Sequence, residues 1–215
     1  QKTVDGYLKD TKPTTEEVVS GLKEALEKGI TNGAKKASAV DGYYKNPQIK
    51  IPFPPDVQKV ETKLRQLGMD KQVDQFIETL NRGAEEAAKQ AAPIFVSAIK
   101  QMTINDAWNI LKGDKDAATQ YLQKTTTSQL ETKFKPVIQK ALDKVNATKY
   151  YGDLVNTYNK IPFVDKVNPD LNDYATTLAI DGLFKLVAQE EANIRSNPGA
   201  RTTELLKKVF KEQDN

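Results

Sequence analysis

Six polar residues on predicted helices could carry chemistry. They are Asn81, Arg82, Glu85, Asp106, Glu190 and Arg195. The other core-facing positions of these helices are apolar. A carboxyl group held in a dry site has a raised pKa and can act as a general acid, while amide and guanidinium groups can orient a substrate. The same residue types also satisfy one another inside helical bundles. Each therefore has a functional and a structural interpretation.

The segment LNRGAEEAA (80–88) holds three of the six. On a helix, Asn81 and Glu85 flank the apolar face, and Arg82 and Glu86 lie opposite it. Asn81 and Glu85 could thus form a polar ledge pointing at a ligand. The alternative, which we favour, is an interhelical hydrogen bond together with a surface Arg82–Glu86 pair.

The segment QEEANIR (189–195) places Glu190 inside an apolar arc. Glu190 could serve as a general acid, or it could be a buried carboxylate held by Arg82 or Arg195 to fix helix packing. Glu191 and Arg195 are four residues apart and can pair. Asp106 follows Thr103 at the spacing of a helix N-cap, so we expect it to cap that helix end.

The chain has 215 residues, with no histidine and no cysteine. These absences exclude a Ser-His-Asp triad, a thiolate nucleophile and zinc or iron–sulfur sites with the usual ligands. The two acidic runs nearest to a calcium loop, 114–125 and 168–179, lack its glycine and its final glutamate. We therefore assign no catalytic residue, no metal and no cofactor.

The formal net charge of +3 is spread along the chain, and only four of the 32 basic residues are arginine. Nucleic-acid readers usually carry a basic stripe and arginine forks, so no nucleic-acid partner is expected. No apolar run reaches the 18 or more residues of a membrane span.

The N-terminal part of the chain predicts a tail, a helix and an extended strap. Residues 1–13 are polar and read as a flexible tail before an all-helical domain over 14–212. Thr14 and Glu17 fit a capping box that opens a helix to about residue 40. Residues 41–55 alternate apolar side chains but contain four prolines, which predicts an extended strap across helices rather than a central strand.

The rest of the chain predicts helices throughout. A long helix over 70–101, capped by Asp70, should be kinked at Pro93, which removes a backbone donor. Further helices are expected over 103–112, 114–126, 129–145 (opened by a capping box at Ser128), 147–160, 169–196 (capped by Asn168) and from Pro198 to about 210. The predicted fold is a single-domain all-α bundle of about eight to ten helices.

Several segments together resemble one bacterial family. They are GLKEAL (21–26), DGYYKNPQIKIPFP (41–54), LNRGAEEAA (80–88), KQMTINDAWNIL (100–111), GDKDAATQYL (113–122) and DGLFKLVAQEEANIR (181–195). They are similar, in the same order, to the uncharacterised domain of unknown function family 4197. The resemblance implies an all-helical exported protein of the bacterial envelope, some members being of lipoprotein type. It supplies no catalytic residues. Gly83 and Glu86 stand where the family usually shows small alanine-like residues.

These observations favour a non-catalytic binding or interaction module with a groove between helices, located in the periplasm or at the outer membrane. The expected partner is a small ligand or an envelope protein, and a lipid anchor would lie upstream of Gln1. One alternative is a carboxylate-only enzyme on a glycan or cell-wall substrate, with Glu190 or Glu85 as the acid. Another is a purely structural helical scaffold.

Overall fold

The structure, a computed structural model, describes residues 14–196 and is entirely helical apart from turns and loops in that range. The helices are α1 (Thr15–Ser38), η1, a 3₁₀ turn (Pro55–Val57), α2 (Gln58–Gln66), α3 (Asp70–Ala88), α4 (Ala91–Lys100), α5 (Ile104–Lys112), α6 (Ala117–Asp143), α7 (Ala147–Asn159) and α8 (Leu171–Ser196). The predicted all-α single domain is confirmed. The helix expected after Pro198, like the tail over 1–13, lies outside the described residues.

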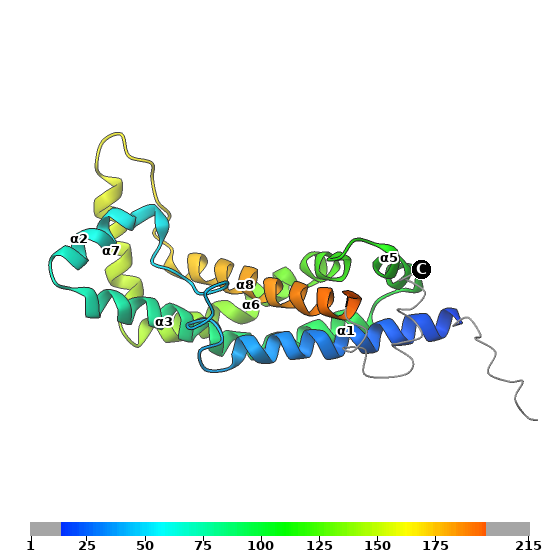
Figure 1. The fold of residues 1–215 in the computed structure, drawn as a ribbon. Helices are drawn as coiled ribbons and strands as arrows, with labels where there is room; N and C mark the ends of the chain where they lie inside the picture. Colours follow the sequence, from blue (N-terminus) through cyan, green and yellow to red (C-terminus); the bar gives the residue numbers. More distant parts are fainter. Residues whose placement is uncertain (1–13, 197–215) are drawn as a thin grey trace, which may run out of the picture.

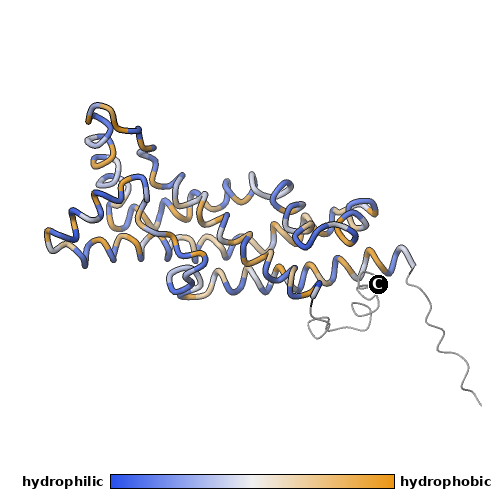
Figure 2. Tube along the Cα trace, turned by 45° about the horizontal axis from the view of Figure 1, so that its top comes forward, coloured by the Kyte–Doolittle hydropathy of each residue, from blue (hydrophilic) through white to orange (hydrophobic). Residues whose placement is uncertain are grey.

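The bundle is elongated (Figure 1). Helices α1, α6 and α8 run along it, α2, α3 and α7 gather at one end, and α5 lies at the other. Hydrophilic and apolar residues alternate along the helices (Figure 2), as expected of amphipathic helices that share one core. The core is therefore long and narrow, and α6 and α8 run between its two ends.

Helices α1 and α8 approach closely at two glycines of α1. A Cβ on Gly29 would lie 2.8 Å from Ile194 Cδ1, and one on Gly33 would lie 3.5 Å from Glu190 Cγ. The glycines that weaken α1 locally thus allow it to pack tightly on α8. The predicted cap of α1 is confirmed, because Thr14 Oγ1 accepts a hydrogen bond from the Glu17 N–H at 3.1 Å.

The helix expected over 70–101 is interrupted where a kink was predicted. α3 ends at Ala88 and α4 begins at Ala91, while Lys89 and Gln90 keep right-handed helical dihedrals. Pro93 has no N–H to donate to the Lys89 carbonyl, so the helix cannot continue regularly through this turn. The predicted cap at Asp70 is wrong: Asp70 is the first helical residue, and Met69 precedes it without a side-chain cap.

The two helices predicted over 114–126 and 129–145 are one helix, α6, and the capping box at Ser128 is not used. The Ser128 carbonyl instead accepts a hydrogen bond from Thr132 Oγ1 within the helix. The buried residues of α6 recur every four positions and cross the expected break: Ala118, Leu122, Thr126, Leu130, Phe134, Ile138 and Leu142. This continuous buried stripe packs on α3 and α8 and overrides the local start signal.

The predicted proline-rich strap is confirmed. The side chains of Ile49, Ile51 and Phe53 are buried at alternating positions, and the side chain of Tyr43 is buried as well. A Cβ on Gly182 would lie 3.0 Å from both Ile49 Cβ and Tyr43 Cε1, so α8 supports the strap through a position that has no side chain.

Helix α8 begins after a capped turn, although not with the predicted cap. Asp170 Oδ1 accepts a hydrogen bond from the Asp173 N–H at 3.0 Å, and Asn168 Oδ1 accepts one from the Asp170 N–H. Asp170 is therefore the residue that satisfies the first helical turn, because α8 starts two residues later than expected.

Candidate functional site

Asn81, on α3, fastens the strap to the bundle. Its Oδ1 accepts a hydrogen bond from the Ile51 N–H, and its Nδ2 donates to the Ile51 carbonyl, both at 2.8 Å. Nδ2 also donates to the Ile77 carbonyl one helical turn back. Because Asn81 is fully buried, its amide has a structural role at this position.

Glu85 lies one turn further along α3 and holds the start of the strap. Its carboxylate accepts hydrogen bonds from the N–H groups of Asp41, Tyr43 and Tyr44 at 3.0, 3.3 and 3.1 Å. Arg82 donates to Glu85 Oε1 at 2.7 Å. The backbone of Asp41 is left-handed, with φ of 69°, so Glu85 stabilises a turn that is unfavourable for most residues.

Arg82 does not form the surface pair predicted with Glu86. It bridges Glu85, Asp41 and Glu78, while Glu86 pairs with Lys89. Glu85 faces the strap and attracts Arg82 to that side of α3. The hydrogen bond from Lys45, with Arg82 beside it, lowers the pKa of the Asp41 carboxyl.

Glu190 is buried on α8 as expected, but neither Arg82 nor Arg195 holds it. Its carboxylate accepts hydrogen bonds from Asn32 Nδ2 at 2.9 Å and from Lys36 Nζ at 2.6 Å, both on α1. These partners come from the closely packed helix that Gly33 admits. Glu190 thus joins α8 to α1, and it forms these hydrogen bonds with none of the partners of Glu85 named above.

Glu191 was predicted only as a partner of Arg195, yet it is buried and fixes a helix end. It accepts hydrogen bonds from the N–H groups of Ala118 and Thr119 at 2.8 and 2.9 Å, and from Thr119 Oγ1 at 2.7 Å. The predicted ion pair is present, with Arg195 Nη2 at 3.0 Å. A carboxylate at the N-terminus of α6 also meets the positive end of the helix dipole.

Arg195 and Asp106 have structural partners of their own. Arg195 donates to the carbonyls of Ile110 and Leu111 at the end of α5. Asp106 and Thr103 form the reciprocal capping box of α5, as predicted. The six candidates therefore lie in separate contacts: Asn81, Arg82 and Glu85 meet at the strap, Glu190 joins α8 to α1, Arg195 joins α8 to α5, and Asp106 caps α5.

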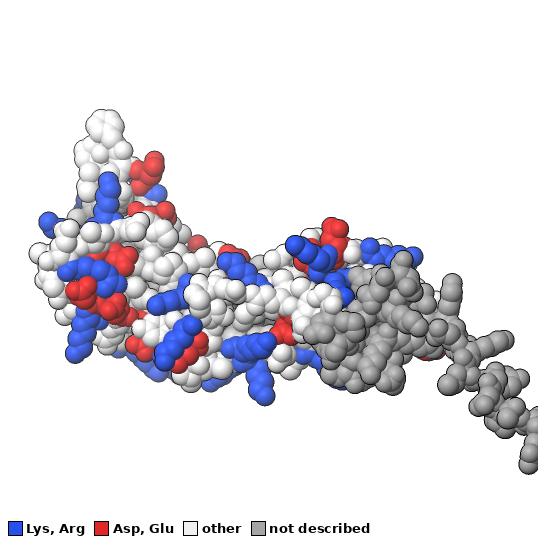
Figure 3. Space-filling view, in the orientation of Figure 1, with Lys and Arg blue, Asp and Glu red and all other residues white. Residues whose placement is uncertain are grey.

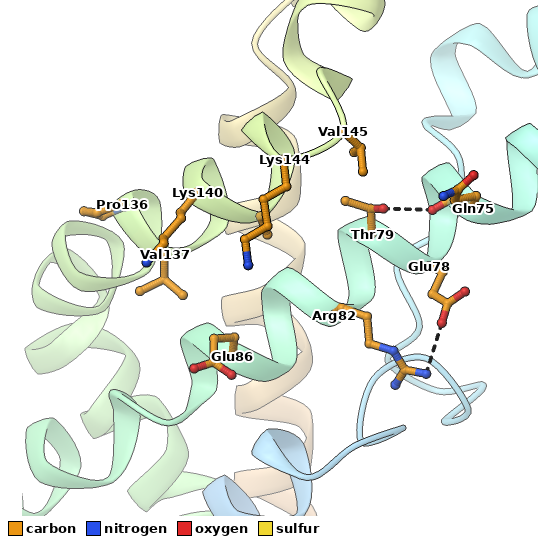
Figure 4. Close-up of a pocket in the computed structure, with 11 residues that line it drawn as sticks. Gln75, Glu78, Thr79, Arg82, Glu86, Pro136, Val137, Lys140, Lys144 and Val145 are labelled. Carbon is orange, nitrogen blue, oxygen red and sulfur yellow. Dashed lines mark hydrogen bonds and ion pairs between the residues drawn. The ribbon is translucent and has the colours of Figure 1, made fainter.

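A surface groove runs along α3, between α3, α6 and α7, and Figure 4 shows the part beside α6. Its first part, of about 770 Å³, lies between α3 and α6 and is lined by Gln75, Glu78, Thr79, Arg82, Glu86, Pro136, Val137, Lys140, Ala141, Lys144 and Val145. Its second part, of about 480 Å³, is mostly apolar and is lined by Phe53, Leu64, Met69, Gln72, Val73, Gln75, Phe76, Thr79, Val145, Ala147, Tyr150, Tyr151 and Leu154. Gln75, Thr79 and Val145 belong to both, so the two parts are continuous. Of the six candidates, only Arg82 lines this groove.

The packing of α6 on α3 and the turn from α6 into α7 explain why the groove forms. A Cβ on Gly83 would lie 3.3 Å from the Ala141 Cβ, so α6 packs closely on α3 there. Asn146, with φ of 52°, then turns the chain into α7. Tyr151 of α7 stacks on Phe76 of α3, with ring centroids 6.2 Å apart, and thereby forms the apolar end of the groove.

Large apolar side chains are exposed around this end of the molecule. Six exposed apolar side chains among the described residues belong to α7 or to the turns and loops next to α2, α3 and α7. They are Leu67, Met69, Val145, Tyr150, Ile161 and Phe163. The projecting tip at the upper left of Figure 3 is uncharged, whereas both signs of charge are mixed over the rest of that face. Large exposed apolar patches are a common feature of interaction surfaces.

Two further properties concern the described part of the chain. It contains no group of three or more acidic side chains arranged to hold a metal ion. None of its helices combines the length and the apolar composition needed to cross a membrane.

The fold and the groove define an all-α single-domain protein with an elongated surface cleft at one end. The chain matches the family described as Protein of unknown function (DUF4197) over residues 12–211, and it belongs to that family. No curated protein and no solved structure matches the chain.

Proposed function

We propose that the protein is a non-catalytic binding module whose binding site is the groove between α3, α6 and α7. The observation that carries this proposal is the continuity of a mostly apolar cavity, next to Phe76 and Tyr151, with an open cleft lined by charged side chains. The volumes lie in the range of small-molecule sites, which are mostly apolar with a few polar groups. An elongated ligand with an apolar part fits this arrangement.

The buried carboxylates give less support to the carboxylate-only enzyme. Glu85 accepts four hydrogen bonds from the strap and Arg82, and Glu190 is held by two side chains of α1. Carboxylates that already accept these hydrogen bonds have little capacity left to exchange a proton with a substrate. The enzyme and scaffold alternatives stay predictions.

The groove can be tested with the neutral fluorescent probe N-phenyl-1-naphthylamine. Thr79 lies where the two parts of the groove meet, and Thr79→Trp fills that junction. We expect saturable binding by the parent protein and a loss of about tenfold in affinity for Thr79→Trp. Thr127→Trp is the matched control, because Thr127 is equally half-buried on a helix and makes the same type of hydrogen bond to its own backbone.

Two outcomes would overturn the proposal, provided that circular dichroism shows both variants folded. One is the absence of saturable probe binding by the parent protein, which would favour the scaffold. The other is equal probe affinity of the Thr79→Trp and Thr127→Trp variants, because binding would then occur elsewhere.

The proposed location is the bacterial envelope, and its support is the family resemblance. The full-length native protein, followed by antibody through cell fractionation, is expected in the periplasmic or outer-membrane fraction. Recovery with the cytosolic fraction would overturn this location without affecting the groove.

A further inference from the structure

We infer that the ligand of the groove is a single-chain amphiphile with one negative charge, of the fatty-acid type. This inference rests on the proposed function and adds the chemistry of the ligand to it. The apolar part of the groove would hold the hydrocarbon chain, and the part between α3 and α6 would hold the carboxylate.

The two parts of the groove differ in their side chains. Phe76, Tyr151 and Leu154 lie in the apolar part, where packing against a hydrocarbon chain would remove apolar surface from water. Lys140 on α6 and Lys144, the residue directly after α6, line the other part about one helical turn apart. Figure 4 shows both lysines extending from α6 over the space beside α3.

Only some of the charged side chains that line the α3–α6 part form ion pairs with other described residues. Glu78 pairs with Arg82, and Glu86 pairs with Lys89. Arg82 is fully engaged with Glu78, Glu85 and Asp41. Within residues 14–196, no ion pair involves Lys140 or Lys144, so they are the cations available to an anion.

The number of charges favours a monoanion. Three cations and two carboxylates line this part of the groove, so the lining as a whole carries one net positive charge. A carboxylate head group would balance that charge. The two carboxylates also disfavour a more highly charged anion, because like charges repel at short range.

The experiment compares three ligands with twelve-carbon chains: dodecanoate, dodecanol and dodecyltrimethylammonium. Each displaces N-phenyl-1-naphthylamine at concentrations below its critical micelle concentration or, for dodecanol, its solubility limit. We expect dodecanoate to bind about three- to tenfold more tightly than dodecanol, as two exposed ion pairs would give, and the cation to bind most weakly. The difference between dodecanoate and dodecanol should narrow at high salt.

A charge-matched pair of variants completes the test. In Lys140→Gln/Lys144→Gln, dodecanoate is expected to bind no better than dodecanol. The control Lys124→Gln/Lys185→Gln removes the same charge from exposed positions that do not line the groove, and it should keep the parent preference.

The outcomes separate the two proposals. Equal displacement by dodecanoate and dodecanol from the parent protein would overturn the inference and leave the apolar groove intact. A preference for dodecanoate that survives in Lys140→Gln/Lys144→Gln would also overturn it. Failure of all three ligands to displace the probe, or failure of the probe to bind, would overturn the proposed function as well.

Discussion

The side chain of Asn81 forms with the backbone of Ile51 the pair of hydrogen bonds that a neighbouring β-strand would form. Asn81 Oδ1 accepts from the Ile51 N–H, and Asn81 Nδ2 donates to the Ile51 carbonyl. The strap has no strand beside it, and Pro52 has no N–H to donate. A single buried amide on α3 thus satisfies both polar groups of Ile51, whose side chain is fully buried.

Asn81→Asp should therefore destabilise the protein strongly. The substitution removes the donors to Ile51 and Ile77 and places a carboxylate next to two carbonyl oxygens. We expect a loss of about 3 kcal/mol in the free energy of unfolding, measured by urea denaturation. The control is Asn156→Asp, at an exposed position of α7, with an expected change within about 0.5 kcal/mol. Similar small changes in both variants would contradict the role of Asn81.

Two glycine-to-alanine substitutions should have opposite effects on stability. A Cβ on Gly182 would meet Ile49 Cβ and the Tyr43 ring at 3.0 Å, so Gly182→Ala must displace the strap and should cost about 1–3 kcal/mol. Gly152, within α7, has open space at that position, and Gly152→Ala should add about 0.5–1 kcal/mol through helix propensity. Thermal unfolding of the two variants measures both effects, and a stabilised Gly182→Ala variant would contradict the close packing of α8 on the strap.

The sequence predicts most helices and the strap because their signals are local. Thr14 and Thr103 cap helices at the predicted places, and the prolines of 41–55 prevent a central strand. The split of α6 at Ser128 was wrong because a capping box is also a local signal. The stripe from Leu122 to Leu142, spaced by four residues, was the competing evidence and is visible in the sequence.

The candidate site was harder to predict, because hydrogen bonds between helices depend on which elements meet. Periodicity correctly placed Glu190 on a buried face, but its partners Asn32 and Lys36 are more than 150 positions away. The groove combines segments around Phe76, Lys140 and Tyr151, none of which carries a recognisable motif. The one sequence signal for it is the group of apolar residues near the ends of predicted helices, such as Val145 and Tyr150.

Glu191→Ala should be among the most destabilising single changes. It removes the carboxylate that satisfies two N–H groups of α6, and it leaves Arg195, whose side chain is 8% exposed, without this partner. Breaking a buried pair in this way costs about 3–5 kcal/mol. Glu86→Ala is the control, since the exposed Glu86–Lys89 pair should contribute less than about 1 kcal/mol. Urea denaturation of both variants at pH 7 tests the difference.

The protein should lose stability above pH about 10, the ordinary pKa of tyrosine. Burial raises the pKa of Tyr43, and burial raises the pKa of Tyr151 to about 12. The unfolded chain therefore releases these protons first, so the stabilisation is complete below pH about 10 and decreases as the pH rises through the folded-state pKa values. Each such tyrosine contributes a slope of about 1.4 kcal/mol per pH unit.

The variant Tyr43→Phe separates this effect from general alkaline denaturation. At pH 7 it should lose about 1 kcal/mol, because the hydroxyl donates to the Ala179 carbonyl. Between pH 10 and the folded-state pKa its unfolding free energy should decrease less steeply than that of the parent, by about one proton's slope. Parallel pH profiles of the two proteins would contradict a buried, neutral Tyr43.

Phe163 should be replaceable with a gain in stability. It is fully exposed in the loop between α7 and α8, and its φ of 64° is left-handed, which is strained for a bulky side chain. Asparagine tolerates this conformation, and no packing is lost, so Phe163→Asn should add about 0.5–1 kcal/mol. Val40→Asn, at another exposed position but without a positive φ, should change stability by less than about 0.5 kcal/mol. Thermal unfolding decides between them: a destabilised Phe163→Asn variant would mean that the phenylalanine ring packs against the protein.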